Sequence, residues 1–249
     1  MKRFLSMVLL TGLLVSWGTL ETAAQSVSAE VAGRIIEGLK RARPDLEYDS
    51  VTRTPVDGIY QVAVTGGPVI YTTADADYMF AGDLYQVLPG QFVNVAEQGR
   101  AEKRREVLAG LDRNEMIVFP PSGETRAVVN VFTDVDCGFC RRFHQEVPAL
   151  NRQGVEVRYL AYPRAGVGSG TYRKMVSAWC ADEPREALAR LKRGEAVAEN
   201  LCDDNPVAEQ FRLGREFGVT GTPSLVLMDG TLLAGYRPAP ELLKILGLD

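Results

Sequence analysis

The sequence has four cysteines and one histidine, and two of the cysteines form the motif Cys137-Gly138-Phe139-Cys140. The motif follows an apolar, β-branched run, Ala127 to Thr133, and opens a helical stretch, Phe139 to Asn151. A cysteine at the start of a helix has an acidic thiol, because the helix dipole and unpaired N–H groups stabilise its thiolate. The motif therefore predicts thiol–disulfide exchange, in which the exposed sulfur of Cys137 attacks a disulfide and Cys140 resolves the adduct.

Other sites also use closely spaced cysteines, including zinc sites and fixed local disulfides. A zinc site would need a second pair of ligands, but Cys180 and Cys202 are too far apart to form another Cys-X-X-Cys motif. His144 lies one helical turn after Cys140, on the Cys140 side of the helix rather than at the Cys137 sulfur. We expect no metal site and no cofactor, and a packing or surface role for His144.

A second signal is the segment Gly221-Thr222-Pro223, which precedes the apolar run Ser224 to Met228. Proline cannot donate to a β ladder, so it belongs here at a strand start, where its peptide bond is sometimes cis. Strands and helices alternate from Met116 onward, which is typical of a sheet with crossover connections. The expected strands are Met116 to Phe119, Ala127 to Thr133, Val155 to Ala161, Ser224 to Met228 and Thr231 to Ala234.

The first half of the chain has a different pattern, with one helix and an antiparallel meander. Apolar residues at helical spacing predict a helix over Val27 to Lys40. Turn-forming segments separate the expected strands Val51 to Thr54, Ile59 to Val64, Val69 to Thr73 and Asp83 to Val87. So small a unit has little core and leaves a sheet edge open, which favours pairing with a second copy.

Between these halves lies a segment rich in Glu, Lys and Arg, Val95 to Leu111. It reads as a charged linker helix, the alternative being the first helix of the next domain. At the N-terminus, Lys2 and Arg3 precede the uncharged run Phe4 to Leu20 and the small residues Thr22-Ala23-Ala24. This pattern predicts a secretory signal peptide, residues 1–24, rather than an uncleaved membrane anchor, because the run is shorter than the ~20 residues of a membrane span.

Composition narrows the function classes. The 249 residues are 46% hydrophobic and 24% charged, which is typical of a globular protein and suits two domains. The formal net charge of −4 argues against nucleic acid as a partner, because binding there requires neutralising many phosphates. Export would bring the cysteines into oxidising conditions, in which disulfides persist.

Together, the cysteine motif and Gly221-Thr222-Pro223 resemble the thioredoxin superfamily, in which a cis-proline loop faces the active cysteines and offers backbone groups to an extended substrate. The resemblance narrows to the DsbC family of periplasmic disulfide isomerases. The stretches that carry it are Phe132-Thr133-Asp134, Cys137 to Cys140, Val157 to Arg164, Trp179-Cys180 and Gly218 to Pro223. The exported N-terminus, small first domain and linker helix also agree with that family, so the likeness covers the whole mature chain.

This resemblance implies an α/β protein with a C-terminal thioredoxin-like domain that carries a helical insertion, residues 115–249. A small α+β dimerisation domain, residues 25–90, and a linker helix, residues 91–114, precede it. The resemblance makes Cys137 the nucleophile and Cys140 its resolving partner. It also makes Thr222 and Pro223 the substrate-binding cis-proline loop.

Cys180 and Cys202 match the family's non-catalytic structural disulfide, the alternative being two unpaired buried thiols. Where thioredoxins place a buried carboxylate that assists proton transfer, this chain has Val131. Asp134 and Asp136 are expected to be solvated and to raise the Cys137 pKa, whereas the helix dipole and the pair Arg141 and Arg142 lower it. The sign of the sum stays open.

The implied function is that of a periplasmic homodimer that rearranges non-native disulfides in misfolded exported proteins and is kept reduced by a DsbD-type membrane reductase. A DsbG-like reductase that protects single cysteines is the nearest alternative. A thiol-independent holdase chaperone is the alternative from another class, although a holdase has no need of a Cys-X-X-Cys motif at a helix start.

Overall fold

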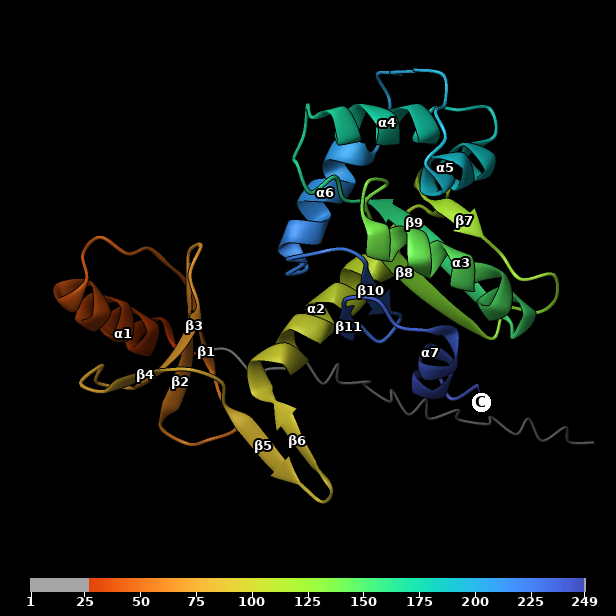
Figure 1. The fold of residues 1–249 in the computed structure, drawn as a ribbon. Coiled ribbons are helices and arrows are strands. Elements are labelled where there is room, and N and C mark those ends of the chain that lie inside the picture. The colour runs from red at the N-terminus through yellow and green to blue at the C-terminus, as the bar shows by residue number, and fades with distance from the viewer. Residues whose placement is uncertain (1–26, 249) are drawn as a thin grey trace, which may run out of the picture. The chain divides into compact units, whose positions relative to one another are not determined.

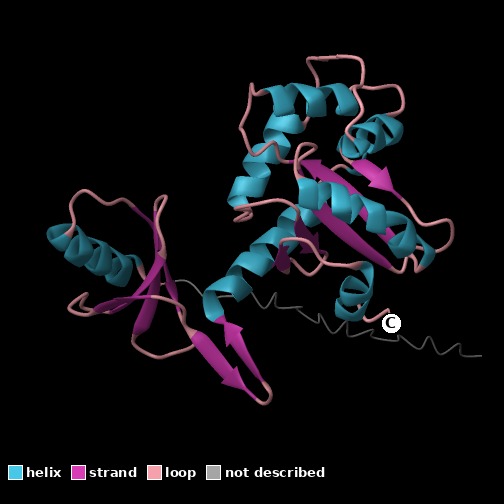
Figure 2. Ribbon diagram, viewed as in Figure 1, coloured by secondary structure: helices cyan, strands magenta, loops and turns pink. Residues whose placement is uncertain are grey.

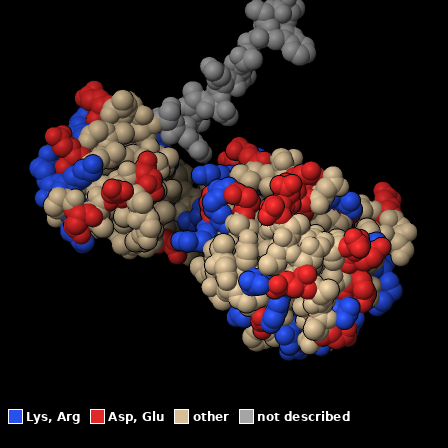
Figure 3. All heavy atoms as spheres, turned by 90° about the horizontal axis from the view of Figure 1, so that it is seen from above, with Lys and Arg blue, Asp and Glu red and all other residues tan. Residues whose placement is uncertain are grey.

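The computed structural model describes residues 27–248, so the predicted signal peptide lies outside the described residues. These residues divide into two compact units, the first ending at Leu84 and the second beginning at Tyr85 (Figures 1 and 2). In the part of the chain that is described, no helix is both long and apolar enough to cross a bilayer. Figure 3 shows Lys and Arg interspersed with Asp and Glu on the visible face.

The first unit packs one amphipathic helix on an antiparallel sheet. Helix α1, Ala29–Ala42, begins at Ser28, whose hydroxyl accepts a hydrogen bond from the Val31 N–H. The sheet has the order β1-β2-β3-β4, with strands Tyr48–Arg53, Ile59–Val64, Val69–Thr73 and Met79–Ala81. Its core contains Ile35 and Leu39 from the helix and Tyr60, Val62, Val64 and Ile70 from the sheet.

The fourth strand of this sheet is Met79–Ala81, so the prediction of Asp83 to Val87 as the fourth strand is wrong. All three residues of β4 are exposed. The strand therefore lacks the alternation of apolar and polar residues by which a half-buried strand is predicted from sequence. Tyr85–Leu88 (β5) instead pairs with Gln91–Asn94 (β6) in a separate hairpin of the second unit. Gly90, at φ +79°, supplies the left-handed turn conformation.

The second unit is built on a five-stranded sheet of order β11-β10-β8-β9-β7. Its strands are Ile117–Phe119 (β7), Ala127–Thr133 (β8), Val155–Ala161 (β9), Ser224–Leu227 (β10) and Leu232–Ala234 (β11). β8 and β9 are parallel, and the other neighbours are antiparallel. The predicted bounds of β8 and β9 are confirmed, and the other three strands are one residue shorter than predicted.

Alternating side chains of this sheet feed two apolar clusters. Val131 lies in the cluster with Phe143 of helix α3, Gly138–Arg152, and the next residue, Phe132, lies in the other cluster with Leu108 of helix α2, Val95–Gly110. Four further α-helices and the 3-10 helix Arg113–Glu115 complete the unit, the α-helices being Gly170–Trp179 (α4), Pro184–Arg193 (α5), Val207–Glu216 (α6) and Ala239–Ile245 (α7). Helices α4, α5 and α6 lie between β9 and β10 in the chain and form the helical insertion (Figure 1).

Helix α2 is packed into the second unit. The buried Arg104 guanidinium donates hydrogen bonds to the carbonyl oxygens of Gly230, at 2.7 Å, and Phe217, at 3.2 Å, and also pairs with Glu97. At Gly230, with φ +86°, an added Cβ would lie 1.8 Å from the Ala101 carbonyl oxygen, so only glycine allows this close approach. Such contacts are expected if the charged segment Val95 to Leu111 is the first helix of the second unit rather than a linker helix between domains.

Candidate active site

The cysteine motif lies where β8 leads into α3. Strand β8 ends at Thr133, a short turn follows, and Cys137 is the N-cap residue of α3 with extended backbone angles. The Cys137 thiol donates a hydrogen bond to the Thr222 carbonyl oxygen, 3.2 Å away, and the Thr222–Pro223 peptide bond is cis. The structure thus brings together the four residues that the resemblance assigns to exchange and substrate binding.

Both cysteines are free thiols and both are buried. Cys137 is only 3% exposed and Cys140 is fully covered, so the expectation of an exposed Cys137 sulfur is wrong. The Cys137 thiol is occupied by its bond to the Thr222 carbonyl, in the loop before β10. Phe139, between the two cysteines, is instead 62% exposed, so the part of the motif at the protein surface is an apolar ring.

The pKa of the Cys137 thiol is lowered. Burial is the largest single influence and raises it, but Thr222, the backbone N–H and side chain of Cys140, and the positive charge of Arg164 together outweigh burial. The buried Thr222 hydroxyl forms no hydrogen bond with the described residues, so its dipole is available to a thiolate.

The pKa of the Cys140 thiol moves in the opposite direction. Burial raises it and dominates, although the charge of Lys192 and the hydroxyls of Thr222 and Thr133 lower it. A pair of titrating groups whose pKa values are driven apart is the usual basis for separate acid and base roles. Here the separation favours a thiolate on Cys137 while Cys140 keeps its proton.

Of the two carboxylates beside the motif, Asp134 differs from expectation. Asp134 is 2% exposed rather than solvated, because its carboxylate accepts hydrogen bonds from the Asp136 N–H at 2.7 Å and from the backbone and side chain of Arg164. Asp136 is exposed, as expected, and its carboxylate accepts hydrogen bonds from Thr171 and Lys174. Both charges are thus largely compensated by nearby partners.

Two cations near the cysteines received no role from the sequence. Arg164 pairs with Asp134 and is the cation that lowers the Cys137 pKa, in place of the expected Arg141 and Arg142. Arg142 instead covers the ring of Tyr236, 4.8 Å from its centroid. The second cation, Lys192 of α5, is buried beside Cys140. The helical pattern of α5 gave no sign that a lysine faces inward.

His144 packs into the core. Its Nδ1 lies 2.9 Å from the Tyr159 hydroxyl, and its ring meets Phe119 edge to face. Burial, together with the charges of Lys192 and Arg193, lowers the His144 pKa to about 4, so the imidazole is neutral at pH 7. Within residues 27–248, no hydrogen bond joins it to either free cysteine, which agrees with a packing role.

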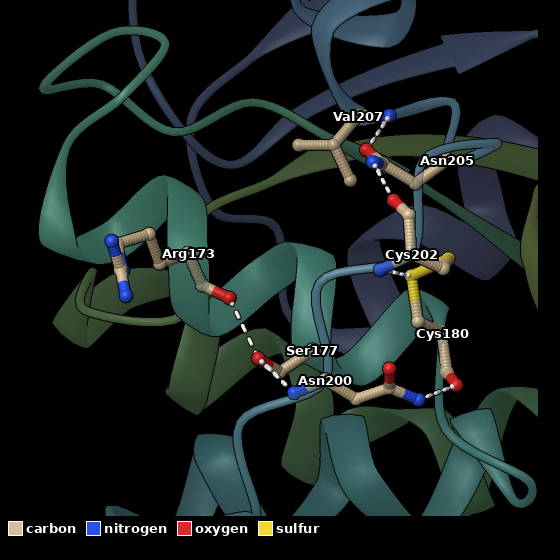
Figure 4. Close-up of a disulfide and its surroundings, with 7 residues drawn as sticks. All are labelled: Arg173, Ser177, Cys180, Asn200, Cys202, Asn205 and Val207. Atoms are coloured by element: carbon tan, nitrogen blue, oxygen red, sulfur yellow. Dashed lines mark hydrogen bonds between the residues drawn. A yellow bond between two sulfur atoms is a disulfide. The ribbon is translucent and has the colours of Figure 1, made fainter.

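Away from this site, Cys180 and Cys202 form a disulfide with a Cα–Cα distance of 5.9 Å (Figure 4). It ties the end of α4 to the segment that leads into α6. Asn200 fixes one side, donating its backbone N–H to Ser177 at 3.1 Å and its side-chain amide to the Cys180 carbonyl. In the part of the chain described, no cluster of three His, Cys, Asp or Glu side chains could hold a metal ion.

Comparison with known proteins agrees with this geometry. Residues 113–248 match the thioredoxin-like domain family, and residues 21–97 match the family described as the disulfide bond isomerase protein N-terminal domain. The chain is 35% identical over 205 residues to the thiol:disulfide interchange protein DsbC of Escherichia coli, covering 82% of this chain and 84% of that one. The chain belongs to the DsbC family.

A second DsbC relative, from Haemophilus influenzae, is 36% identical over 227 residues, which cover 90% of this chain and 96% of the relative. Among solved structures, the catalytic domain of Proteus mirabilis ScsC matches with a TM-score of 0.50 and 20% identity, over 60% of this chain and 96% of that domain. That likeness shows the fold alone. DsbC-family membership and the thioredoxin-like domain identify the chain as a thiol–disulfide oxidoreductase.

Proposed function

We propose that this chain is a periplasmic protein disulfide isomerase that uses Cys137 as nucleophile and Cys140 as resolving thiol. The observation that carries the proposal is the position of Cys137 at the N-terminus of α3, with its thiol hydrogen-bonded to the Thr222 carbonyl oxygen, and the opposite shifts of the two thiol pKa values support it. A nucleophilic thiol must be a thiolate, whereas a resolving thiol must stay protonated until an adduct forms.

In the proposed reaction, the Cys137 thiolate attacks one sulfur of a non-native disulfide, forms a mixed disulfide and releases a substrate thiolate. That thiolate, or another substrate thiol, then attacks the adduct to make a different pairing, which restores Cys137 without net oxidation. Alternatively, Cys140 attacks Cys137, so that the substrate leaves reduced and the pair becomes a disulfide. The second route needs a reductant, for which a DsbD-type membrane reductase is the proposed partner.

The surface beside the motif suits misfolded chains. Phe139, inside the motif, is 62% exposed, so an apolar contact is available to a substrate next to the reactive cysteine. Thr222 and Pro223 form the proposed binding loop for the substrate backbone. This loop lies at the motif, because the Thr222 carbonyl oxygen accepts a hydrogen bond from the Cys137 thiol. The proposed substrates are misfolded disulfide-containing exported proteins.

Homodimerisation through residues 25–90 is part of the proposal. Strand β4 is a sheet edge with three exposed residues, and Tyr78 and Met79 are large apolar side chains there. An open apolar edge favours association with another strand, and a two-fold pair is the commonest closed arrangement. Two catalytic units would then hold one misfolded chain through repeated exchange.

The decisive experiment is refolding of a scrambled multi-disulfide protein by the mature chain and by Cys137→Ser. We expect the variant to lose isomerisation and to keep any suppression of aggregation. Equal isomerisation by the variant would exclude the enzymatic mechanism. Aggregation suppression without isomerisation in both proteins would favour the holdase, and protection of single cysteines from overoxidation without isomerisation would favour a DsbG-like role.

A further inference from the structure

A buried lysine lies beside the resolving cysteine and has no carboxylate partner. Lys192 is only 4% exposed, and it forms no ion pair with Asp or Glu among residues 27–248. Its ammonium group donates to the Thr133 hydroxyl and, at 3.0 Å, to the Asp134 carbonyl oxygen. It also lies 5.8 Å from the centroid of the Tyr159 ring. Burying a charged lysine without a carboxylate partner destabilises the fold, unless a nearby group of opposite charge compensates the ammonium charge at some stage of the reaction.

The nearest group that could use this charge is Cys140. Thr133 links the two groups, because its hydroxyl accepts a hydrogen bond from Lys192 and its dipole lowers the pKa of the Cys140 thiol. All three side chains are buried, so water is largely excluded from the path. Cys140 cannot attack while protonated, and its position leaves few groups that could take the proton.

Other groups around Lys192 do not replace Cys140 as the partner. The Asp134 carboxylate is held by Arg164 and by the Asp136 N–H. Arg141 of α3 repels the ammonium group, while Cys137 attracts it. His144 and Arg193 are also near, but the His144 ring nitrogen is bonded to Tyr159 and Arg193 pairs with Glu186 and Glu195. Among these neighbours, Cys140 is therefore the one whose proton must leave during the resolving step.

We propose that Lys192, in its neutral amine form, accepts the proton of Cys140 during resolution, and that the Thr133 hydroxyl carries this proton between them. The inference rests on the proposed roles of Cys137 and Cys140. Lys192 touches no substrate atom and acts through Thr133, so it is a positioning residue for the exchange reaction. It occupies the place in the mechanism left open by Val131, where a carboxylate would otherwise assist proton transfer.

The step balances in atoms and charge. The Cys140 thiol gives its proton to the Thr133 oxygen as Thr133 gives its own proton to the Lys192 amine. The Cys140 thiolate then attacks the Cys137 sulfur of the mixed disulfide. A bond forms between Cys137 and Cys140, the bond between Cys137 and the substrate breaks, and the substrate sulfur leaves as a thiolate. The substrate is reduced, the cysteine pair is oxidised, and the new ammonium balances the new thiolate.

The burial of Lys192 supports this role. Burial lowers its pKa to about 8, against the opposing influence of Cys140, Asp134 and Cys137, so a useful fraction of the amine is neutral near neutral pH. An ordinary surface lysine would be almost entirely protonated there and could not accept the proton.

Single-turnover reaction with the aromatic disulfide DTNB tests the proposal on the full-length mature protein. Attack by Cys137 releases one thionitrobenzoate ion, and resolution by Cys140 releases a second, so stopped-flow absorbance separates the two steps. For Lys192→Met, which keeps most of the side-chain volume, we expect the second phase to slow by about tenfold or more at pH 7 and the first phase to change little. The pH at which the second phase reaches half its maximal rate should also rise.

Two further variants keep the test sharp. Thr133→Val removes the hydroxyl at nearly constant volume and should slow the second phase as Lys192→Met does, with little further loss in the double variant. It also serves if Lys192→Met fails to fold. The matched control is Lys244→Met, the same substitution at an exposed position of α7, which should leave both phases unchanged.

Thiolate absorbance at 240 nm provides a readout that needs no exchange reaction. In a Cys137→Ser background, the Cys140 titration should move upward by about one pH unit on adding Lys192→Met. An unchanged titration together with an unchanged second phase would overturn the proposal. Failure of the proposed function would look different, because the protein with native Lys192 would then show no first phase or no isomerisation.

Discussion

The Cys137 thiol donates a hydrogen bond to the Thr222 carbonyl oxygen, which lies 85 residues further along the chain. This bond joins the start of α3 to the loop that precedes β10, so the reactive sulfur and the cis peptide bond form one site. On ionisation, Cys137 loses the proton that makes this bond, and the Thr222 hydroxyl becomes a donor available to the thiolate. Thr222 can thus interact with both protonation states of the nucleophile.

Replacing the resolving thiol should trap the reaction at its first stage. In Cys140→Ala the mixed disulfide with Cys137 can no longer be attacked from within the motif, so substrate adducts should accumulate. Non-reducing gels of the variant incubated with a scrambled disulfide protein check this. The double variant Cys137→Ser, Cys140→Ala is the control and should form none. Adducts that form on Cys137→Ser alone would reverse the assignment of the two roles.

The features predicted best from the sequence are those with a local physical cause. Strands β8 and β9 consist mostly of buried residues and are rich in β-branched and other apolar side chains, so the sequence predicts their bounds correctly. Strand β4 was missed because an exposed edge strand of three residues shows no periodicity. The burial of Asp134 could not be read from its neighbours, since its main partner, Arg164, comes from another part of the chain.

The same reasoning explains why the role of Lys192 was missed. An inward-facing lysine near the end of an amphipathic helix looks like any C-terminal basic residue, which the helix dipole favours. Only the packing of α5 against α3 shows that its amine reaches Thr133 and the Cys140 region. The burial of Asp134 and the inward orientation of Lys192 thus both depend on contacts between residues that are distant in sequence.

The Cys180–Cys202 disulfide should stabilise the protein without taking part in turnover. Replacing both cysteines by alanine should lower the free energy of unfolding by about 3 kcal/mol, the chain-entropy value for a loop of this size. Thermal unfolding measures the loss, and isomerase activity per folded molecule should be nearly unchanged. Mild reduction followed by mass spectrometry should leave this disulfide intact when Cys137 and Cys140 are free. A loss of turnover in folded protein would contradict the structural role.

His144 should make the protein sensitive to moderate acid. Its pKa is about 4 in the folded state, mainly because of burial, against about 6.5 in an unfolded chain. Between these pH values the unfolded state binds the proton and the folded state does not, so stability is complete above pH 6.5 and falls by up to roughly 3 kcal/mol toward pH 4.

Because the chain has a single histidine, its imidazole titration can be followed by NMR without ambiguity. Urea unfolding from pH 4 to 7 should show a smaller acid loss in His144→Gln, whose amide can keep the bond to Tyr159. Carboxylates affect both proteins similarly, so the difference between the two curves isolates the histidine. An imidazole that titrates near 6.5 in the folded protein would contradict its burial.

Association through β4 should be required for efficient isomerisation. Met79 is 51% exposed on this edge strand, so Met79→Lys should give a monomer by placing a charge in the interface. That monomer should still reduce small disulfides but isomerise scrambled proteins poorly. Val56→Lys, at an exposed position in the loop between β1 and β2, is the matched control.

A truncation gives an independent check. It should begin at Asn94, because the Asn94 side chain caps α2 and the second unit needs that helix for the contacts of Arg104 and Leu108. Sedimentation would establish the oligomeric state of each form. A monomeric full-length mature protein, or full isomerase activity in the truncated form, would exclude the dimer as the functional unit.

The buried Lys192 should cost the protein stability. Its pKa is lowered to about 8, chiefly by burial, from 10.5 in an unfolded chain, so the unfolded state binds more protons between these pH values. Wild-type stability should therefore rise as pH increases from 8 to 10.5. Below pH 8 both states are protonated and the full cost applies, about 3 kcal/mol at pH 7.

Lys192→Met removes this cost but leaves the Asp134 carbonyl and the Thr133 hydroxyl without their donor, an offset of about 1–2 kcal/mol. We therefore expect the reduced variant to be more stable than the reduced wild type by about 1–2 kcal/mol at pH 7. The advantage should shrink as pH rises toward 10. Denaturant unfolding at pH 7 and 9.5 measures both effects, with Lys244→Met as the exposed control. A variant less stable than wild type at pH 7 would show that Lys192 serves packing. A variant that is more stable yet slower in resolution would show that the protein forgoes stability for this step.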